Sequence, residues 1–229
     1  MSGTTGYASA GAQHRSRPRV RIVRAPVGEE AGDEVDAELT NVVTPQDESE
    51  STTAERPPAA VTSETTAVRR VQRVLAREPV VTVARGMSKF GDHALGWLAL
   101  GAVGAITDRR RRREWILAAA GVAASHGASI AVKRLVRRER PGDPGIRVLV
   151  DTPSRLSFPS SHATSTTTAA VLYGRLLGRG LTPVLVPPMM VSRLVLGVHY
   201  PSDVVVGSSL GGAVALSVRR YVKRRRNCG

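Results

Sequence analysis

The sequence has little cysteine, few aromatic residues and almost no lysine, and the first two shortages each exclude a kind of site. The single cysteine, Cys228, stands next to the last position, so neither a disulfide framework nor a cysteine metal cage can form within one chain. Aromatic residues make up 3% of the sequence, too few for a surface that stacks nucleic-acid bases. Only Lys89, Lys133 and Lys223 are lysines, so arginine carries nearly all of the positive charge behind the net +14.

Charge divides the chain into two parts. Residues 1–68 hold 11 acidic and 6 basic side chains (net −5), whereas residues 69–229 hold 8 acidic and 27 basic ones (net +19). The first part is rich in Ser, Thr, Pro, Glu and Asp and has few large apolar residues, so it cannot bury enough surface to offset the entropy lost on folding. We therefore expect a disordered acidic tail over 1–68 and a folded basic domain over 69–229.

The sequence also lacks an uninterrupted apolar run of the ~20 residues that a helix needs to cross a bilayer. It has four shorter apolar segments, a more polar helix candidate between the second and third, and an amphipathic stretch ahead of the first. Glycine, alanine and serine inside the segments allow helices to pack closely in lipid. We therefore predict an all-α, multi-span transmembrane helical bundle, with a soluble helical core as the alternative. The apolar segments are 94–107, 115–132, 181–198 and 204–218, the polar candidate is 161–178, and the amphipathic stretch is 66–93.

Followed as spans, these helices place the arginine clusters on one side and three motif stretches on the other. Excess Lys and Arg mark the cytoplasmic side of membrane proteins, so the motif side is expected outside the cytoplasm. Five crossings would leave the acidic tail outside too, unless the 69–93 region crosses or lies in the interface. The arginine clusters are 109–113, Arg175 with Arg179, and 219–226, and the motif stretches lie within 133–160 and 193–203.

Three of the cationic side chains on the motif side are Lys133 and Arg140 in "KRLVRRERP", and Arg193 in "SRLVLGVHYPSD". Charges that simply flank a span are the plainer interpretation of the first pair. Together, however, the three could hold one tetrahedral dianion, because arginine binds bidentately and lysine acts as a point charge. In "PSSH", Ser160 and the backbone N–H of Ser161 would add a helix N-terminus, which is a ready anion site.

Two histidines and an aspartate could supply the reacting groups. Asp203 can accept the proton of one ring nitrogen of His199 and leave the other nitrogen free to attack phosphorus. His162 would be the second imidazole, needed to protonate a leaving oxygen. A capped turn that opens the last helix is the plainer interpretation of His199 and Asp203.

The order and spacing of these residues resemble the three-part signature of the type 2 phosphatidic acid phosphatase and vanadium haloperoxidase superfamily. The parts are Lys133, six residues, then Arg140 and proline; "PSSH" at 159–162; and "SR", five residues, His199, three residues, Asp203. Ser161 departs from the family pattern, which usually has glycine there. Because this position contributes a backbone N–H, serine is expected to serve, although with less room for a tight phosphate approach.

The resemblance implies a mechanism. His199 would be the nucleophile that forms a phosphohistidine, Asp203 its orienting partner, and His162 first the acid and then the base that activates water. No metal and no cofactor would be required. The phosphoryl oxygens would be held by Lys133, Arg140, Ser160, Ser161 and Arg193.

The resemblance also implies a lipid phosphate substrate and the bilayer as partners. This short, arginine-rich chain is most similar to actinobacterial members that dephosphorylate decaprenylphosphoryl-5-phosphoribose, a precursor of cell-wall arabinan. Phosphatidate or a polyprenyl diphosphate is the alternative substrate. The other classes left open are a vanadium haloperoxidase, a basic nucleic-acid-binding protein and a non-catalytic membrane scaffold. Nucleic acid is not an expected partner, and the oligomeric state stays open.

Overall fold

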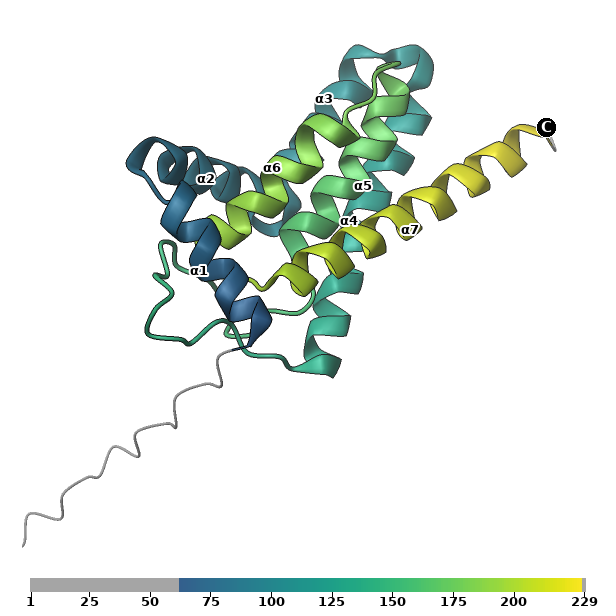
Figure 1. Ribbon diagram of the computed structural model, residues 1–229. Helices are drawn as coiled ribbons and strands as arrows, with labels where there is room; N and C mark the ends of the chain where they lie inside the picture. Colours follow the sequence, from purple (N-terminus) through teal and green to yellow (C-terminus); the bar gives the residue numbers. More distant parts are fainter. Residues whose placement is uncertain (1–61, 228–229) are drawn as a thin grey trace, which may run out of the picture. The chain divides into compact units, whose positions relative to one another are not determined.

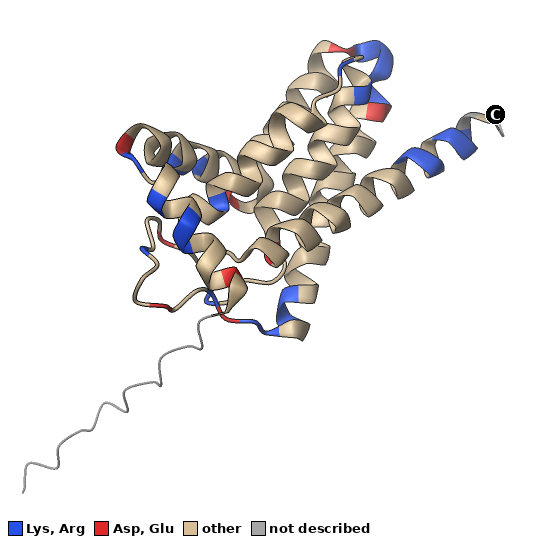
Figure 2. Cartoon of the chain, viewed as in Figure 1, with Lys and Arg blue, Asp and Glu red and all other residues tan. Residues whose placement is uncertain are grey.

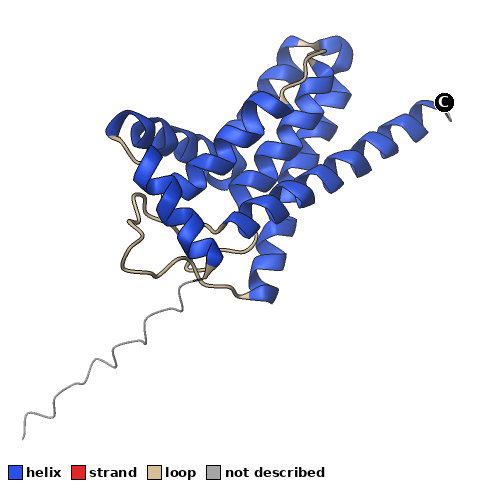
Figure 3. Cartoon of the chain, in the orientation of Figure 1, coloured by secondary structure: helices blue, strands red, loops and turns tan. Residues whose placement is uncertain are grey.

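The computed structural model describes residues 62–227, which fold into helices joined by loops (Figure 3). The predicted disordered tail, up to residue 61, lies outside the described residues. Within 62–227 no strand forms; Glu139 and Leu156 make one isolated antiparallel bridge. The α-helices are α1 (Ser63–Leu75), α2 (Glu78–Gly91), α3 (Leu95–Thr107), α4 (Arg112–Val136), α5 (Ser161–Leu176), α6 (Thr182–Val195) and α7 (Pro201–Asn227), with short 3-10 helices η1 (Asp92–Ala94) and η2 (Arg109–Arg111).

The amphipathic stretch forms two helices, α1 and α2. Thr62 caps the first one, because its side chain accepts a hydrogen bond from Thr65 N at 3.2 Å. The second begins at Glu78 with proline in its first turn, where the missing N–H removes no helical hydrogen bond. Helix α1 therefore includes residues 63–68, which the predicted boundary at residue 69 assigns to the tail.

The apolar segments and the polar candidate all form helices, as predicted. Two of them are long and apolar enough to cross a membrane, Arg109–Val136 and Pro201–Arg225, and Thr182–Val195 is a shorter apolar helix. Only 33% and 28% of the apolar windows in the two long helices are buried within the chain, whereas the core helix of a soluble protein is mostly buried. By length and composition, two of the five expected crossings are therefore met, and most of each apolar window lies outside the core.

Helix α5 lies at the centre and contacts α4, α6 and α7 (Figure 1). Its polar sequence is compatible with burial because several of its hydroxyls bond to backbone: Thr164 Oγ1 donates to Ser160 O at 2.9 Å, and Thr168 Oγ1 donates to Gly211 O at 3.0 Å. The α5 and α7 backbones approach so closely that a Cβ at Gly211 would lie 2.3 Å from Thr164 O. The hydroxyl-rich composition of α5 is thus a feature of helix packing.

Aromatic residues join α5 to α3 and α4. Tyr173 donates to the carbonyl of Trp97 at 3.0 Å, and Trp97 Nε1 donates to Thr166 at 3.2 Å. The rings of Trp115 and Tyr173 lie 5.4 Å apart. These contacts fix the helices whose ends carry the motif stretches.

In α3 to α7 the charged residues gather at the helix ends, and the middles of these helices carry no Lys, Arg, Asp or Glu (Figure 2). Arg111 Nη1 donates to Leu176 O at 2.7 Å, which places η2 beside the last turn of α5. Residues 109–113 line one surface hollow together with Tyr221 and Arg225 of α7. The clusters at 109–113 and 219–225 therefore share one end of the bundle, as predicted; we call it the arginine end. The opposite ends of α4, α5 and α7 carry the motif stretches.

Candidate active site

The three motif stretches meet at the end of the bundle opposite the arginine end. The loop 137–160 joins α4 to α5 there, and the turn 196–200 joins α6 to α7. Two of the eight predicted residues, Ser160 and Asp203, are fully buried behind a cavity of about 290 Å³. The other six line that cavity: Lys133, Arg140, Ser161, His162, Arg193 and His199.

His199 and Asp203 form a buried pair. Nδ1 of His199 lies 3.4 Å from Asp203 Oδ2, an ion-pair distance at which no aligned hydrogen bond is formed. Oδ2 also accepts a hydrogen bond from Tyr200 N at 2.8 Å, which fixes the carboxylate. The other ring nitrogen of His199, Nε2, lies 3.3 Å from Arg140 Nη1. The aspartate thus lies on the Nδ1 side, and Nε2 lies on the side of the cations.

The surroundings of His199 favour its neutral form. Burial lowers its pKa well below the ordinary 6.5, and the positive charges of Arg140, Lys133 and Arg193 lower that pKa further. At neutral pH the imidazole therefore keeps a lone pair, which a nucleophile requires.

Two of the three cations are tied to the loop that closes the cavity. Lys133 Nζ donates to Leu156 O at 3.1 Å and to Ser157 O at 3.2 Å. Arg140 Nε donates to Ser154 O at 2.8 Å, and its Nη1 donates to Val198 O at 2.7 Å. Burial lowers the pKa of Arg140 to about 10, so it stays charged at neutral pH.

Arg193, the third cation, is 2% exposed. Its Nε and Nη2 atoms have no hydrogen-bond partner among the described residues. A buried guanidinium without acceptors is costly, and such groups in native proteins usually have a functional reason. An anion in the cavity would supply the acceptors that Arg193 lacks.

The two serines of "PSSH" sit at the N-terminus of α5. Ser160 is the N-cap: its Oγ accepts from Ala163 N at 3.4 Å, and its own N donates to Asp203 O at 2.9 Å. Capping uses an oxygen lone pair and leaves the hydroxyl proton free to be donated. Ser161 lines the cavity, and its Oγ accepts a hydrogen bond from Ser129 Oγ at 2.8 Å.

His162 is held by residues that no sequence pattern marked. Its Nε2 lies 3.0 Å from Ser88 O and 3.2 Å from Asp92 Oδ1. Both are acceptors, so Nε2 is the nitrogen that carries a proton, and Nδ1 remains for proton exchange. The contact with α2 is close, because a Cβ at Gly91 would lie 2.6 Å from the His162 ring.

Four further residues belong to the site or its support and were also missed. His93 and His126 line the cavity, and their ring centroids lie 6.4 Å apart. Arg138 and Glu64 contact the segment that holds Asp203. Arg138 falls at a spacer position of the first motif, and Glu64 lies in α1, far from it in sequence. Among residues 62–227, no three His, Cys, Asp or Glu side chains are grouped so that they could hold a metal ion.

Comparison with known proteins settles the family. The sequence profile of the PAP2 superfamily matches residues 114–227, a region that contains all three motif stretches. The decaprenylphosphoryl-5-phosphoribose phosphatase of Mycobacterium tuberculosis is 57% identical over 149 residues, which cover 65% of this chain and 84% of that protein. The chain belongs to the PAP2 superfamily. A second PAP2 relative, of the same name, from Mycolicibacterium smegmatis, is 56% identical over 138 residues, or 60% of this chain and 77% of that protein.

Solved PAP2 structures share the fold. The transmembrane PAP2-type phosphatidylglycerolphosphate phosphatase from Bacillus subtilis has a TM-score of 0.59 at 20% identity, over 72% of this chain and 89% of that one. LpxE of Aquifex aeolicus has a TM-score of 0.59 at 18% identity, over 71% and 98%. The predicted family, the all-α membrane fold and the phosphoric monoester hydrolase activity are thereby confirmed.

Proposed function

We propose that this chain removes the 5-phosphate of decaprenylphosphoryl-5-phosphoribose, or of a closely similar polyprenyl-phosphate sugar, through a phosphohistidine at His199. The observation that carries the chemistry is the buried, unpartnered Arg193 guanidinium in the same cavity as a neutral His199 backed by Asp203. The relatives' names, at 56% and 57% identity, support the substrate.

The proposed reaction has two steps. His199 Nε2 attacks phosphorus, the bond from phosphorus to the sugar's 5-oxygen breaks, and His162 gives that oxygen a proton. A water molecule then attacks the phosphohistidine while His162 takes a proton from it, and inorganic phosphate leaves. The cations and the α5 N-terminus hold the non-bridging oxygens, whose charge grows in the transition state.

A second cavity supports a substrate with a long apolar chain. It has a volume of about 760 Å³ and lies between α2, α3, α5 and α6. On α2, α5 and α6, residues that line this cavity lie within one helical turn of residues that line the site cavity. On α5 the two are Thr166 and His162, and on α6 they are Met189 and Arg193. A phosphate at His199 would therefore have an apolar channel beside it for its lipid chain. Large side chains in that lining are Phe90, Trp97, Leu100, Tyr173, Leu185 and Met189.

We place the site on the extracytoplasmic face, because the clusters of the arginine end would stay in the cytoplasm. A membrane-impermeant maleimide tests this in intact cells. In a Cys228→Ser background, Arg155→Cys in the site loop should be labelled without lysis, and Arg110→Cys at the arginine end should be labelled only after lysis. The reverse pattern would contradict the orientation.

Phosphate release by the purified full-length protein in detergent tests the proposed function. The panel contains decaprenylphosphoryl-5-phosphoribose, phosphatidate and a polyprenyl diphosphate. The highest kcat/KM is expected for the first, with competitive inhibition by orthovanadate. A higher kcat/KM for phosphatidate or the diphosphate would overturn the substrate assignment but would leave the phosphohistidine mechanism in place.

Other outcomes identify the other classes. Vanadate-dependent bromination of a dye without phosphate release would identify a haloperoxidase. Salt-sensitive binding of DNA without phosphate release would identify a nucleic-acid-binding protein. A folded protein that is inactive on the whole panel and shows neither property would be the scaffold.

A further inference from the structure

Helix α1, which lies before the region matched by the family profile, is bonded to the segment that carries Asp203. Glu64 is in the first turn of α1, and its Oε1 accepts a hydrogen bond from Ser202 N at 2.9 Å. Its Oε2 forms an ion pair with the Arg138 guanidinium. Glu64 therefore contacts residues that are far from it in sequence, and one of them, Ser202, is next to Asp203.

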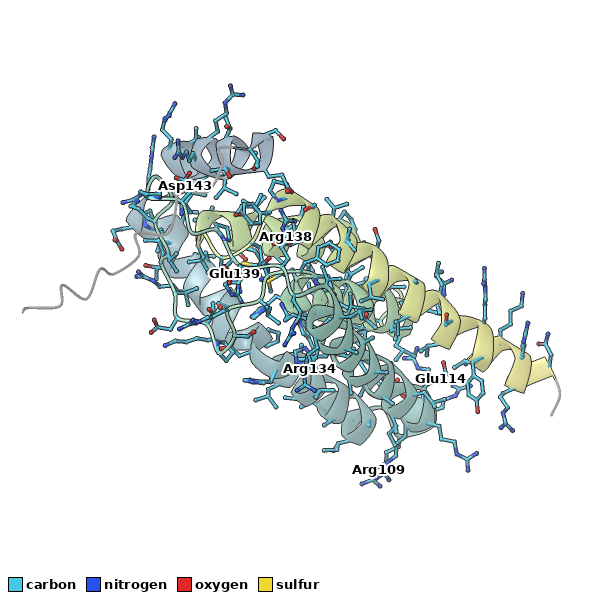
Figure 4. All side chains as sticks on the ribbon, turned by 90° about the horizontal axis from the view of Figure 1, so that it is seen from below. Arg109, Glu114, Arg134, Arg138, Glu139 and Asp143 are labelled. Atoms are coloured by element: carbon cyan, nitrogen blue, oxygen red, sulfur yellow. The ribbon has the colours of Figure 1, made fainter. Side chains whose placement is uncertain are left out.

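Arg138 connects Glu64 to Asp203. Its Nη1 donates to Asp203 Oδ1 at 3.1 Å and to Ser202 Oγ at 2.6 Å. The guanidinium carbon also lies 4.2 Å from the centroid of the Tyr200 ring, a cation–π distance. Figure 4 labels Arg138 near the beginning of α7.

These contacts hold both oxygens of Asp203. Oδ2 accepts from Tyr200 N and lies toward His199, while Oδ1 accepts from Arg138. A carboxylate whose two oxygens both accept hydrogen bonds cannot rotate about the Cβ–Cγ bond without losing one of those hydrogen bonds. Because Asp203 is fully buried, its charge also needs the nearby opposite charge that Arg138 provides.

Glu64 in turn fixes Arg138. Burial acts to raise the pKa of Glu64, but the hydrogen bonds donated by Ser202 and Arg138 outweigh it, so the pKa lies below the ordinary 4.5. Glu64 is therefore an anion at neutral pH. A polar network in which the members satisfy one another is rigid, which suits the support of a reacting group.

We propose that Arg138 and Glu64 are positioning residues, which hold the Asp203 carboxylate so that His199 presents Nε2 to phosphorus. The proposal rests on the proposed function for the role of His199. It gives α1 a part in catalysis through one ion pair and one hydrogen bond, without contact with the substrate.

The chain offers a matched control in the same helix. Arg69 of α1 forms an ion pair with Asp143 of the same loop, away from Asp203. Arg69→Gln removes an α1–loop ion pair as Arg138→Gln does, but leaves Asp203 with its partners. Arg137→Gln, at the neighbouring exposed position, controls for the loss of one positive charge.

The first test compares kcat with phosphate-site binding in the full-length protein. Arg138→Gln should lower kcat by about 10- to 100-fold, and Glu64→Gln by a smaller factor, as the loss of a charge-assisted hydrogen bond would. KM and the inhibition constant of orthovanadate should stay within about twofold, because the anion-holding groups are intact. Arg138→Lys should recover part of the rate, and both control variants should keep the wild-type rate.

The second test is a double-mutant cycle with Asp203→Asn, followed in single turnover with enzyme in excess over an activated aryl phosphate. If Arg138 acts through Asp203, adding Arg138→Gln to Asp203→Asn should cause little further loss. If the losses in kcat caused by Arg138→Gln and Asp203→Asn multiply in the double variant, the proposal is overturned. It is also overturned if Arg69→Gln lowers kcat as much as Arg138→Gln does, or if Arg138→Gln keeps the wild-type kcat. A failed proposed function would look different: His199→Gln would then keep the wild-type rate.

Discussion

The two ends of the helical bundle are both rich in arginine, but their arginines differ in burial and in partners. At the arginine end, the Arg111 side chain is 47% exposed, pairs with Asp108 at 2.8 Å and donates to a backbone carbonyl. At the other end, Arg193 is 2% exposed and two of its nitrogens lack partners. Exposed ion pairs are weak, whereas buried charges without partners attract a counter-charge strongly. The site is distinguished by cationic side chains that are buried and converge on one cavity, and not by the number of arginines.

The largest expected effect concerns His162, the proposed acid at the site end. His162→Ala should lower kcat by about 10²- to 10⁴-fold for an alkyl phosphate, whose leaving oxygen needs a proton, and much less for a nitrophenyl phosphate, which leaves as an anion. Stopped assays with both kinds of substrate measure the two ratios. Equal losses for both would contradict the assignment of His162 as the acid.

The next effect tests the two ends against each other. Arg193→Gln should lower kcat/KM by about 10² or more, because it removes charge-assisted bonds that strengthen in the transition state. Arg110→Gln, at the arginine end, removes the same charge and should change kcat/KM by less than about twofold, as a screened surface charge would. Comparable losses in both variants would show that the whole-chain charge matters and not the cavity.

A smaller effect concerns the helix contact that supports the site end. Gly211→Ala should destabilise the protein by about 1–3 kcal/mol, because the new Cβ would lie 2.3 Å from Thr164 O and separate α5 from α7. Gly212→Ala meets nothing within 4 Å and should instead stabilise α7 by up to about 1 kcal/mol. Thermal unfolding in detergent measures both, and equal shifts would contradict the close packing.

The smallest effect is a shift in pH dependence. Arg140→Gln removes a positive charge beside His199 and should raise the histidine's pKa, so that kcat/KM falls off at a higher pH on the acid side. The shift should be less than about one pH unit. Because both proteins are assayed with one substrate, its own ionisation cancels. Arg110→Gln serves as the control and should leave the acid limb in place.

The motif residues could be selected from the sequence because their order and spacing resemble a family signature, and the structure brings six of them to one cavity. Their catalytic roles stay predictions. Helix locations followed in the same way from apolar segments bounded by arginine or proline. The burial of α5 could not be predicted in this way, because a threonine-rich helix is typical of a solvent-facing position. In the structure the threonine hydroxyls find partners inside the bundle, as Thr168 does by donating to the Gly211 carbonyl at 3.0 Å. The partners of His162 and the ion pair of Arg138 with Glu64 did not follow either, since Ser88, Asp92 and Glu64 come from helices that only the tertiary fold brings to the site.

Trapping the phosphohistidine is the sharpest test of the proposed transfer of phosphate to His199. The full-length protein is mixed with an activated aryl phosphate, denatured in alkali, which preserves phosphohistidine, and digested for mass spectrometry. The expected result is one phosphate on His199 in the wild type, accumulating in His162→Ala because hydrolysis is slowed. Phosphate on another residue, or turnover by His199→Gln at the wild-type rate, would contradict the account.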